Sequence, residues 1–213
     1  MSKVRFDIAM SLDGYVAGPG QSEENPLGIG GEELHQWAFK LASWREAHGR
    51  EGGEVNASSE VVAESQTGLG ATIMGRNMFG GGPGPWGDDP WNGWWGDEPP
   101  FHRPVFVLTH HEHEPLTLGE TTFTFVTDGI ESALAHAREA AGEQDVHIAG
   151  GAEVAQQYLA AGLVDEMQLS LVPVLLGGGE RLLENFGDSP PQLEQLRVIE
   201  APGVTHLKYR VLK

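Results

Sequence analysis

Short apolar runs recur along the chain and predict the strands of a sheet. The first is Val4 to Met10, and the longest is Asp165 to Val174. Runs of about four to eight apolar residues, bounded by glycine, proline or polar turn residues, are typical of strands buried in a sheet. Four further runs have this form: 71–75 (ATIMG), 104–109 (PVFVLT), 122–127 (TFTFVT) and 146–150 (VHIAG).

Between these runs, apolar residues recur at helical spacing. The pattern predicts a helix from Glu32 to His48, with an apolar face formed by Leu34, Trp37, Ala38, Leu41 and Trp44. A helix from Ser59 to about Thr67 would be capped by Ser58 or Ser59. Two more helices are predicted over 130–141, with Asp128 near its start, and over 152–161.

The C-terminal segments LEQLRVIEA and THLKYRVLK alternate in part, and they predict an antiparallel pair joined near Pro202 and Gly203. Strands that alternate with helices predict an α/β fold. We expect a three-layer α/β/α sandwich whose mostly parallel central sheet ends in antiparallel C-terminal strands. No composition break is long enough to be a linker, so residues 1–213 are predicted to form a single domain.

The segment 80–104 departs from this alternation. It holds four of the six tryptophans (Trp86, Trp91, Trp94 and Trp95) among glycine, proline and acidic residues. Such a composition excludes a regular helix or a central strand. A loop of this length is either a functional wall or lid over a ligand, or an ordered insertion whose tryptophans cover the edge of the core. The first reading is favoured, and it predicts that Trp94 and Trp95 contact substrate.

Composition narrows the classes of function. The formal net charge of −18 argues against nucleic acid and anionic membrane surfaces as partners. The absence of cysteine excludes disulfides and thiolate chemistry. No apolar run approaches the roughly 20 residues of a membrane helix, and Asp7 and Asp13 interrupt the only N-terminal apolar stretch, so a cytoplasmic protein is expected.

The stretch VHIAGGAEVAQQYL joins a strand to a helix through Gly150 and Gly151. Residues without a Cβ let a ligand approach the backbone, and the N–H groups at a helix start favour anions. Two glycines at such a junction also serve as a tight turn, which on its own is the commoner reading. The stretch does not match the G-x-G-x-x-G pattern of dinucleotide-binding folds.

Three other polar motifs each have two readings. Asp13 in SLDG could fix a ring N–H or a sugar hydroxyl, or could simply form a turn with Gly14. Arg76 in GRNMF suits a phosphate because its planar fork donates two hydrogen bonds, although a surface ion pair is the alternative. The run HHEHE (110–114) predicts no metal site, because adjacent residues at a strand end point in alternating directions.

Taken in order, these motifs resemble the dihydrofolate-reductase-like superfamily. The match is strongest to the branch that contains the reductase domain of bacterial riboflavin biosynthesis (the RibD C-terminal domain) and its stand-alone relatives. It extends from Val4 to Lys213. The motifs that carry it are SLDGYVAG, IMGRNMF, VFVLTHH, IAGGAEVAQQYL, LVDE and PVLLGGG.

The resemblance implies NADPH as cofactor, lying across the carboxyl ends of the strands. Gly150 and Gly151 would then pass close to the pyrophosphate and nicotinamide. Thr109 and His110 would meet the adenosine 2′-phosphate. The other cofactor positions that the resemblance implies are Gly75, Arg76, Asn77, Ala152, Glu153, Val154 and Gly178.

The resemblance also implies hydride transfer to a C=N or C=O carbon of a small heterocyclic (pteridine or pyrimidine-type) or carbonyl substrate, in riboflavin- or folate-type metabolism. Asp13 and Glu166 are the catalytic candidates, with Asp13 also facing substrate. The chain departs from the folate enzymes, since only Glu32, Glu33 or His35 could replace their pocket carboxylate. It departs from the riboflavin enzymes too, because no Lys or Arg cluster suits a ribose 5-phosphate, and a chain without cysteine lacks the deaminase zinc site.

Two hypotheses follow. The first is an NADPH-dependent oxidoreductase similar to 5-amino-6-(5-phosphoribosylamino)uracil reductase or dihydrofolate reductase. The second is a non-catalytic member of the fold that binds a nucleotide or another ligand. A homodimer is expected by resemblance alone.

Overall fold

The chain folds as two compact units, described here from a computed structural model. The structure describes residues 2–82, 84–88 and 91–213. Unit 1 comprises Met1–Phe6, Gly68–Asp165 and Asn185–Pro190, and unit 2 comprises Asp7–Thr67, Glu166–Glu184 and Pro191–Lys213. The single domain expected from the sequence stays a prediction.

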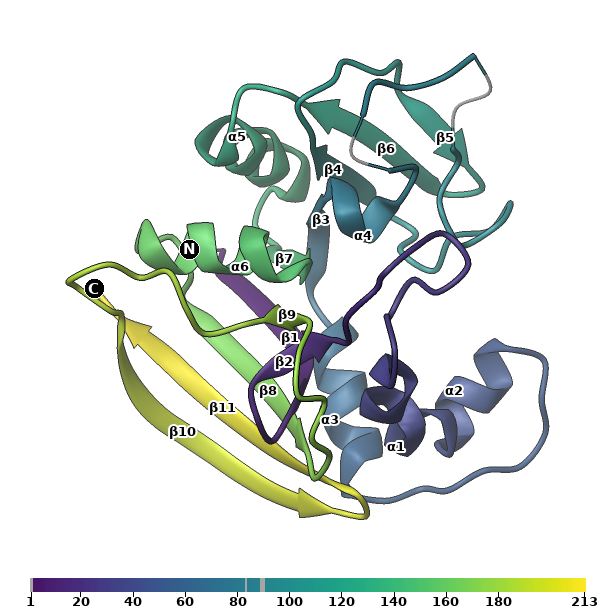
Figure 1. The fold of residues 1–213 in the computed structure, drawn as a ribbon, viewed down its shortest axis with the longest axis vertical. Coiled ribbons are helices and arrows are strands. Elements are labelled where there is room, and N and C mark those ends of the chain that lie inside the picture. The colour runs from purple at the N-terminus through teal and green to yellow at the C-terminus, as the bar shows by residue number, and fades with distance from the viewer. Residues whose placement is uncertain (1, 83, 89–90) are drawn as a thin grey trace. The chain divides into compact units, whose positions relative to one another are not determined.

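The strands of unit 1 form a mainly parallel sheet in the order β1-β7-β3-β4-β6-β5 (Figure 1). The pairs β1–β7, β7–β3, β3–β4 and β4–β6 are parallel, and β5 is antiparallel to β6. Every residue of β3 is buried, as expected for a central strand covered on both faces. The strand bounds are β1 Val4–Ser11, β3 Leu69–Gly75, β4 Pro104–Leu108, β5 Leu116–Leu118, β6 Thr121–Val126 and β7 Asp145–Gly150.

Three helices pack on this sheet. α5 (Ile130–Ala141) contacts β3, β4 and β7, and buries Ala133, Leu134, Ala137 and Ala141 on one face. α6 (Ala152–Ala160) contacts β7 and β3, and α4 (Arg76–Phe79) is a single turn directly after β3. The two long helices therefore lie where the helical spacing of the sequence predicted them.

The boundary between the units falls within β1, whose residues from Asp7 on belong to unit 2. The strands of unit 2 follow the order β10-β11-β8-β1, in which β10 (Gln192–Ala201) and β11 (Val204–Leu212) form the predicted antiparallel pair. β11 is also antiparallel to β8 (Glu166–Val172). A separate two-stranded sheet pairs β2 (Tyr15–Ala17) with β9 (Glu180–Arg181), and α3 (Ala57–Gln66) packs on β10. The mixed α/β fold with antiparallel C-terminal strands is confirmed.

The single helix predicted from Glu32 to His48 is wrong. The segment forms a 3₁₀ turn η1 (Gly31–His35) and two short helices, α1 (Gln36–Phe39) and α2 (Ala42–Ala47). Leu41 interrupts them with an extended backbone (ψ 142°) and forms a bridge with Glu54. The backbone hydrogen bonds around Leu41 go to Glu54 instead of continuing the helix: Ala42 N donates to Glu54 O, and Glu54 N donates to Lys40 O.

The cap of α3 also differs from the expectation. Asn56, not Ser58 or Ser59, is the N-cap: its side chain accepts from Ser58 N (2.9 Å), and Asn56 N donates to Ser59 Oγ (3.2 Å). The helix thus begins two residues earlier than predicted. The strands that the sequence did not predict, β2, β5 and β9, have two or three residues and leave no periodic signal. Among the described residues, no helix combines the length and apolar character that crossing a membrane requires.

Candidate functional site

The turn between β7 and α6 consists of two glycines at the start of a helix. Gly150 ends β7 with φ 135°, and its peptide bond to Gly151 is cis. A Cβ on Gly151 would meet nothing within 4 Å, so a ligand atom has room there. Ala155 N donates to Gly151 O (3.2 Å) at the start of the helix, and no side chain caps it. The N–H groups at this helix start therefore suit an anion.

Gly75 lies beside this turn because β3 pairs with β7, with Met74 opposite Gly150. A Cβ on Gly75 would approach Val154 Cγ2 to 2.8 Å, closer than side-chain carbons tolerate. Glycine at position 75 is thus required for α6 to pack closely on the end of β3. The packing brings four predicted cofactor positions together: Gly75, Gly150, Gly151 and Val154.

Arg76 begins α4 directly after β3. Its Nη2 donates to Gly81 O (2.7 Å), and its guanidinium lies over the Trp86 ring. Its Nε and Nη1 are buried and have no hydrogen-bond partner among the residues that the structure describes. Removal from water lowers the pKa of Arg76 to about 10, so the group stays charged at neutral pH. Buried donors of a cation are costly when unpaired, and an anionic ligand would supply the missing acceptor. Asn77, the next residue, is exposed.

Thr109 follows β4, the next strand of the sheet, where Gly75 pairs with Leu108. Thr109 N donates to Val126 O (3.1 Å), and its Oγ1 accepts from His111 N (3.2 Å). This local turn buries Thr109 and leaves His110 exposed. The predicted cofactor residues of unit 1 therefore lie at the carboxyl ends of three adjacent parallel strands, β7, β3 and β4. Ligands of α/β folds commonly bind at this edge of a sheet.

The histidine-rich run packs against the tryptophan-rich segment. His111 O accepts from Trp86 Nε1 (3.1 Å), and the His113 ring contacts Trp86 and Phe125, with centroids 4.5 and 4.4 Å away. Within the described part of the chain, no group of three or more His, Asp or Glu side chains is arranged to hold a metal ion. The expectation that no metal binds stays a prediction.

The other tryptophans of the segment fold back onto unit 1. Trp91 Nε1 donates to Phe79 O (2.7 Å), and Trp94 Nε1 donates to Met78 O (2.9 Å), so both satisfy carbonyls of α4. Trp95 stacks on Phe123, a member of the buried core. These contacts match the core-covering reading of the segment. Contact of Trp94 and Trp95 with substrate stays a prediction, and Pro83, Asp89 and Pro90 lie outside the described residues.

Asp13, in unit 2, is an acceptor of several hydrogen bonds. Its Oδ1 accepts from Ser11 Oγ (2.6 Å) and Leu176 N (3.1 Å), and its Oδ2 accepts from Gly177 N (2.8 Å). The Ser11 bond, followed by those from the two backbone N–H groups, lowers the pKa of Asp13 to about 2 despite some desolvation. At neutral pH Asp13 is therefore ionised and joins two loops. Gly178, the next residue of the second loop, is half-buried.

Arg181 reinforces the same pair of loops. Its Nη1 donates to Asp13 O (3.2 Å), its Nη2 donates to Tyr15 Oη (2.8 Å), and the guanidinium lies over the Tyr15 ring. The side chain is exposed. We name the set Ser11, Asp13, Tyr15 and Arg181 the Asp13 cluster.

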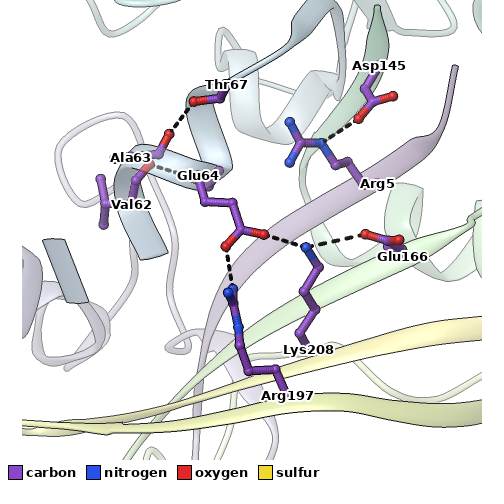
Figure 2. Close-up of polar contacts among 10 residues, drawn as sticks. Arg5, Val62, Ala63, Glu64, Thr67, Asp145, Glu166, Arg197 and Lys208 are labelled. Atoms are coloured by element: carbon purple, nitrogen blue, oxygen red, sulfur yellow. Dashed lines mark hydrogen bonds and ion pairs between the residues drawn. The ribbon is translucent and has the colours of Figure 1, made fainter. Parts of the chain in front are cut away.

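Glu166, the second catalytic candidate, belongs to a different set of contacts in unit 2. At the start of β8 it is buried, and its Oε2 lies 3.4 Å from Lys208 Nζ. Lys208 also pairs with Glu64 (2.6 Å), which in turn pairs with Arg197 (2.5 Å). Figure 2 shows this chain of four charged side chains from α3, β8, β10 and β11. The same view includes an ion pair of unit 1, Arg5 with Asp145, at 3.3 Å.

With this geometry in view, the sequence can be compared with known proteins. The family model of the RibD C-terminal domain matches residues 2–207. The chain belongs to the RibD C-terminal domain family. The resemblance inferred from the motifs is therefore confirmed. No curated protein matches the sequence significantly.

Solved structures share the fold of this family member over its whole length. A protein of Shewanella sp. PV-4, provisionally named a riboflavin biosynthesis protein, is 23% identical, with 99% of each chain covered and a TM-score of 0.65. Dihydrofolate reductase from Enterococcus faecalis, solved with NADP(H), is 13% identical, with 99% of this chain and 97% of that chain covered and a TM-score of 0.55. The predicted dihydrofolate-reductase-like fold is thus confirmed.

A two-activity enzyme of Thermotoga maritima is also similar. It is a diaminohydroxyphosphoribosylaminopyrimidine deaminase/5-amino-6-(5-phosphoribosylamino)uracil reductase, 14% identical, with a TM-score of 0.56. The match covers 99% of this chain and 57% of that one, so this RibD C-terminal domain spans just over half of the longer enzyme.

Two features of this RibD C-terminal domain were not assigned from its sequence. The sequence gives no signal for the contact between Trp86 and Arg76, because no periodicity links the two residues. His206, buried between Ser58 and Ser170, was not considered. Here a signal existed, since alternation along β11 puts His206 on the same face as the buried Val204.

Proposed function

We propose that this chain is an NADPH-dependent reductase that transfers a hydride to a C=N or C=O carbon of a small heterocyclic (pteridine or pyrimidine-type) or carbonyl substrate. The observation that carries the proposal is that Arg76, with two buried donors that have no partner among the described residues, and the glycine turn of α6 follow the carboxyl ends of two adjacent strands, β3 and β7. Family membership supports it. So do the neighbours named as a dihydrofolate reductase with NADP(H) and as a uracil-type reductase of riboflavin metabolism.

The positive charge and the accessible backbone N–H groups of unit 1 support the assignment of a dinucleotide. The backbone N–H groups of Gly151, Ala152 and Val154 would face phosphate oxygens. Glu153 would contribute through its backbone only, because its exposed carboxylate repels phosphate. Arg76 would supply positive charge, with Asn77 beside it, and Thr109 and His110 would lie along the adenosine. When bound, NADPH supplies the hydride from its nicotinamide ring.

The two carboxylates have different proposed roles. Asp13, ionised and held by three donors, accepts hydrogen bonds and does not release a proton near neutral pH. We assign it the orientation of a donor group on the substrate. Glu166 is paired with Lys208, and its catalytic role is retained as a proposal to be tested by substitution. Since Asp13 is ionised, the proton for the reduced atom would come from another source, either solvent or Glu166.

Cofactor binding is the first test. The melting temperature of the protein should rise with NADPH, and rise less with NADH at the same concentration. Binding at 100 times Kd adds about 2.7 kcal/mol to the free energy of unfolding, which is readily measured. The absence of a shift with both nucleotides would refute the proposal. Binding without oxidation of NADPH by any pteridine, pyrimidine or carbonyl compound would instead support the non-catalytic alternative.

Substitution of Arg76 tests the phosphate assignment. Arg76→Ala should weaken NADPH binding by roughly 10- to 100-fold, because a hydrogen bond to a charged group contributes about 1.5–3 kcal/mol. Arg50→Ala is a matched control, since Arg50 also lies over a tryptophan, Trp44, but belongs to unit 2. Equal NADPH affinity in Arg76→Ala and the native protein would reject the assignment.

A further inference from the structure

Trp86 contacts two of the elements to which phosphate contacts are assigned in unit 1. The face of its indole ring lies against the guanidinium of Arg76, directly after β3. Its Nε1 donates to His111 O (3.1 Å), in the turn that follows β4. That turn is held by Thr109 Oγ1, which accepts from His111 N. One side chain of the tryptophan-rich segment thus connects Arg76 with the Thr109 turn.

Arg76 has few other constraints. No carboxylate among the described residues pairs with it, although the chain holds 31 acidic residues. Its orientation depends on one hydrogen bond to Gly81 O and on the Trp86 ring. A free arginine side chain loses about 2 kcal/mol of rotamer entropy when it is ordered. An aromatic platform that orders it before a ligand arrives removes part of that cost from binding.

Trp86 is itself held firmly enough to act as a platform. Besides its bond to His111, its ring meets Phe79 and Phe125 edge-on, with centroids 5.9 and 5.1 Å away, and His113 at 4.5 Å. Trp95 shares the apolar environment of Trp86 but lies against no cation among the residues that the structure describes. Covering the core therefore explains Trp95 fully, whereas Trp86 has a contact that this role does not require.

We propose that Trp86 is a positioning residue for Arg76, and that it raises the affinity of the chain for phosphate groups by fixing the guanidinium that follows the carboxyl end of β3. The inference rests on the proposed function for the identity of the ligand. It assigns part of the tryptophan-rich segment to the cofactor side of the site, rather than to substrate alone. A cation over an indole face gains about 0.5–2 kcal/mol, which corresponds to roughly 2- to 30-fold in affinity.

A double-mutant cycle tests whether Trp86 acts through Arg76. The dissociation constant of NADPH is measured by calorimetry for the native protein, Trp86→Leu, Arg76→Ala and the double variant. We expect Trp86→Leu to weaken binding roughly 2- to 30-fold in the native background, and to have no further effect when Arg76 is already alanine. Trp86→Phe, which keeps a ring face but loses the N–H, should fall between native and Trp86→Leu.

A general loss of packing is separated from positioning by a control and a second probe. Trp44→Leu removes the tryptophan of the Arg50 pair and should leave NADPH affinity unchanged. If Trp86→Leu fails to fold, Trp86→Phe carries the cycle. Inorganic pyrophosphate, titrated against the same variants, should lose affinity in parallel with NADPH.

The outcomes distinguish this inference from the proposed function. If the native protein binds no NADPH, the proposed function fails. The positioning role is refuted, while the reductase proposal stands, if Trp86→Leu and Trp86→Phe bind NADPH as tightly as the native protein does. It is also refuted if the free-energy effects of Trp86→Leu and Arg76→Ala on NADPH binding simply add.

Discussion

The carboxylate of Asp13 accepts hydrogen bonds from the Ser11 hydroxyl and from two backbone N–H groups. The N–H groups belong to Leu176 and Gly177, which are 163 and 164 residues away in sequence. A carboxylate accepts hydrogen bonds at several positions, so these three leave room for a further donor from a ligand. A catalytic acid, by contrast, needs a pKa near the working pH. The pKa of Asp13, about 2, therefore favours a fixed acceptor over an acid.

Asp13→Asn should loosen the loop that contains Leu176 and Gly177. An amide places its NH₂ group against at least one of the N–H donors of Leu176 and Gly177, where the carboxylate had an oxygen. We expect amide hydrogen exchange at these two residues to speed up at least about tenfold, since exposed loops open at low free-energy cost. Asp128→Asn, at an exposed carboxylate before α5, is the control. Unchanged exchange at residues 176 and 177 would show that Asp13 does not hold this loop.

Some single-residue roles could be predicted from the sequence and others could not. Gly150 and Gly151 were candidates because a strand–glycine–helix junction has a local signature, and Gly75 was a candidate through the family resemblance. The structure brings the three positions together, and their roles stay predictions. The contacts of Asp13 and Trp86 depend on loops that meet only in the folded chain. No local pattern encodes which loop will meet which.

At the scale of elements, prediction succeeded where burial is uniform. β3 and α5 were predicted almost to their ends because each has an uninterrupted apolar run or face. The segment 32–48 has the right apolar residues at the right spacing, and Leu34 and Leu41 are indeed buried. It still fails to form one helix, because Glu54 takes the backbone bonds around Leu41. Tertiary hydrogen bonding therefore overrode a correct hydrophobic pattern.

The charged chain in Figure 2 joins the helix α3 to the hairpin β10–β11 through Glu64. Partial burial raises the pKa of Glu64, but the hydrogen bonds and charges of Lys208 and Arg197 outweigh it and lower the pKa. The side chains of Glu64 and Arg197 are about two-fifths exposed, so solvent screens much of their attraction.

Glu64→Gln should lower the free energy of unfolding by about 1 kcal/mol or less, as expected for a partly exposed network. The loss should shrink in about 1 M salt, because salt screens exposed charges. Urea unfolding at low and high salt measures both effects. Glu60→Gln, an exposed acid on the same helix, should have little effect in either condition. A salt-independent loss would mean that Glu64 acts through packing instead of charge.

At the scale of the whole molecule, charge opposes the proposed ligand. A chain with net charge −18 repels a nucleotide phosphate at long range, so affinity has to come from local groups. Arg76 and the N–H groups of the β7–α6 turn are the local groups identified in unit 1. The fold that carries them was predicted from the ordered motifs, and the family match over 2–207 confirms it. The substrate could not be predicted, because the residues that distinguish substrates vary within one fold.

The pH dependence of stability is also a property of the whole chain. Burial lowers the pKa of three histidines, and His206 and His147, which have larger shifts than His35, dominate the expected form near neutrality. His206, in unit 2, is fully buried between Ser58 Oγ (2.8 Å) and Ser170 Oγ (2.9 Å). Desolvation, with the charge of Arg197, lowers the pKa of His206 to about 4. In unit 1, desolvation and the charges of Arg5 and Arg103 lower the pKa of His147 to about 3.

Both shifts make the folded protein less stable in mild acid. Because the unfolded chain binds protons from about pH 6.5 and the folded chain does not until lower pH, stability is complete above about pH 7 and falls as the pH drops from 6.5 toward 4. Each histidine contributes at most about 1.4 kcal/mol per pH unit within that window. Urea unfolding at pH 7.5, 6.5, 5.5 and 5.0 should therefore show a steady fall. In His206→Gln the slope of the free energy of unfolding against pH should fall by about half. His136→Gln, at an exposed ring, should keep the native slope. The net charge changes almost equally in both variants, so an identical slope in the two would show that burial of His206 does not set the acid sensitivity.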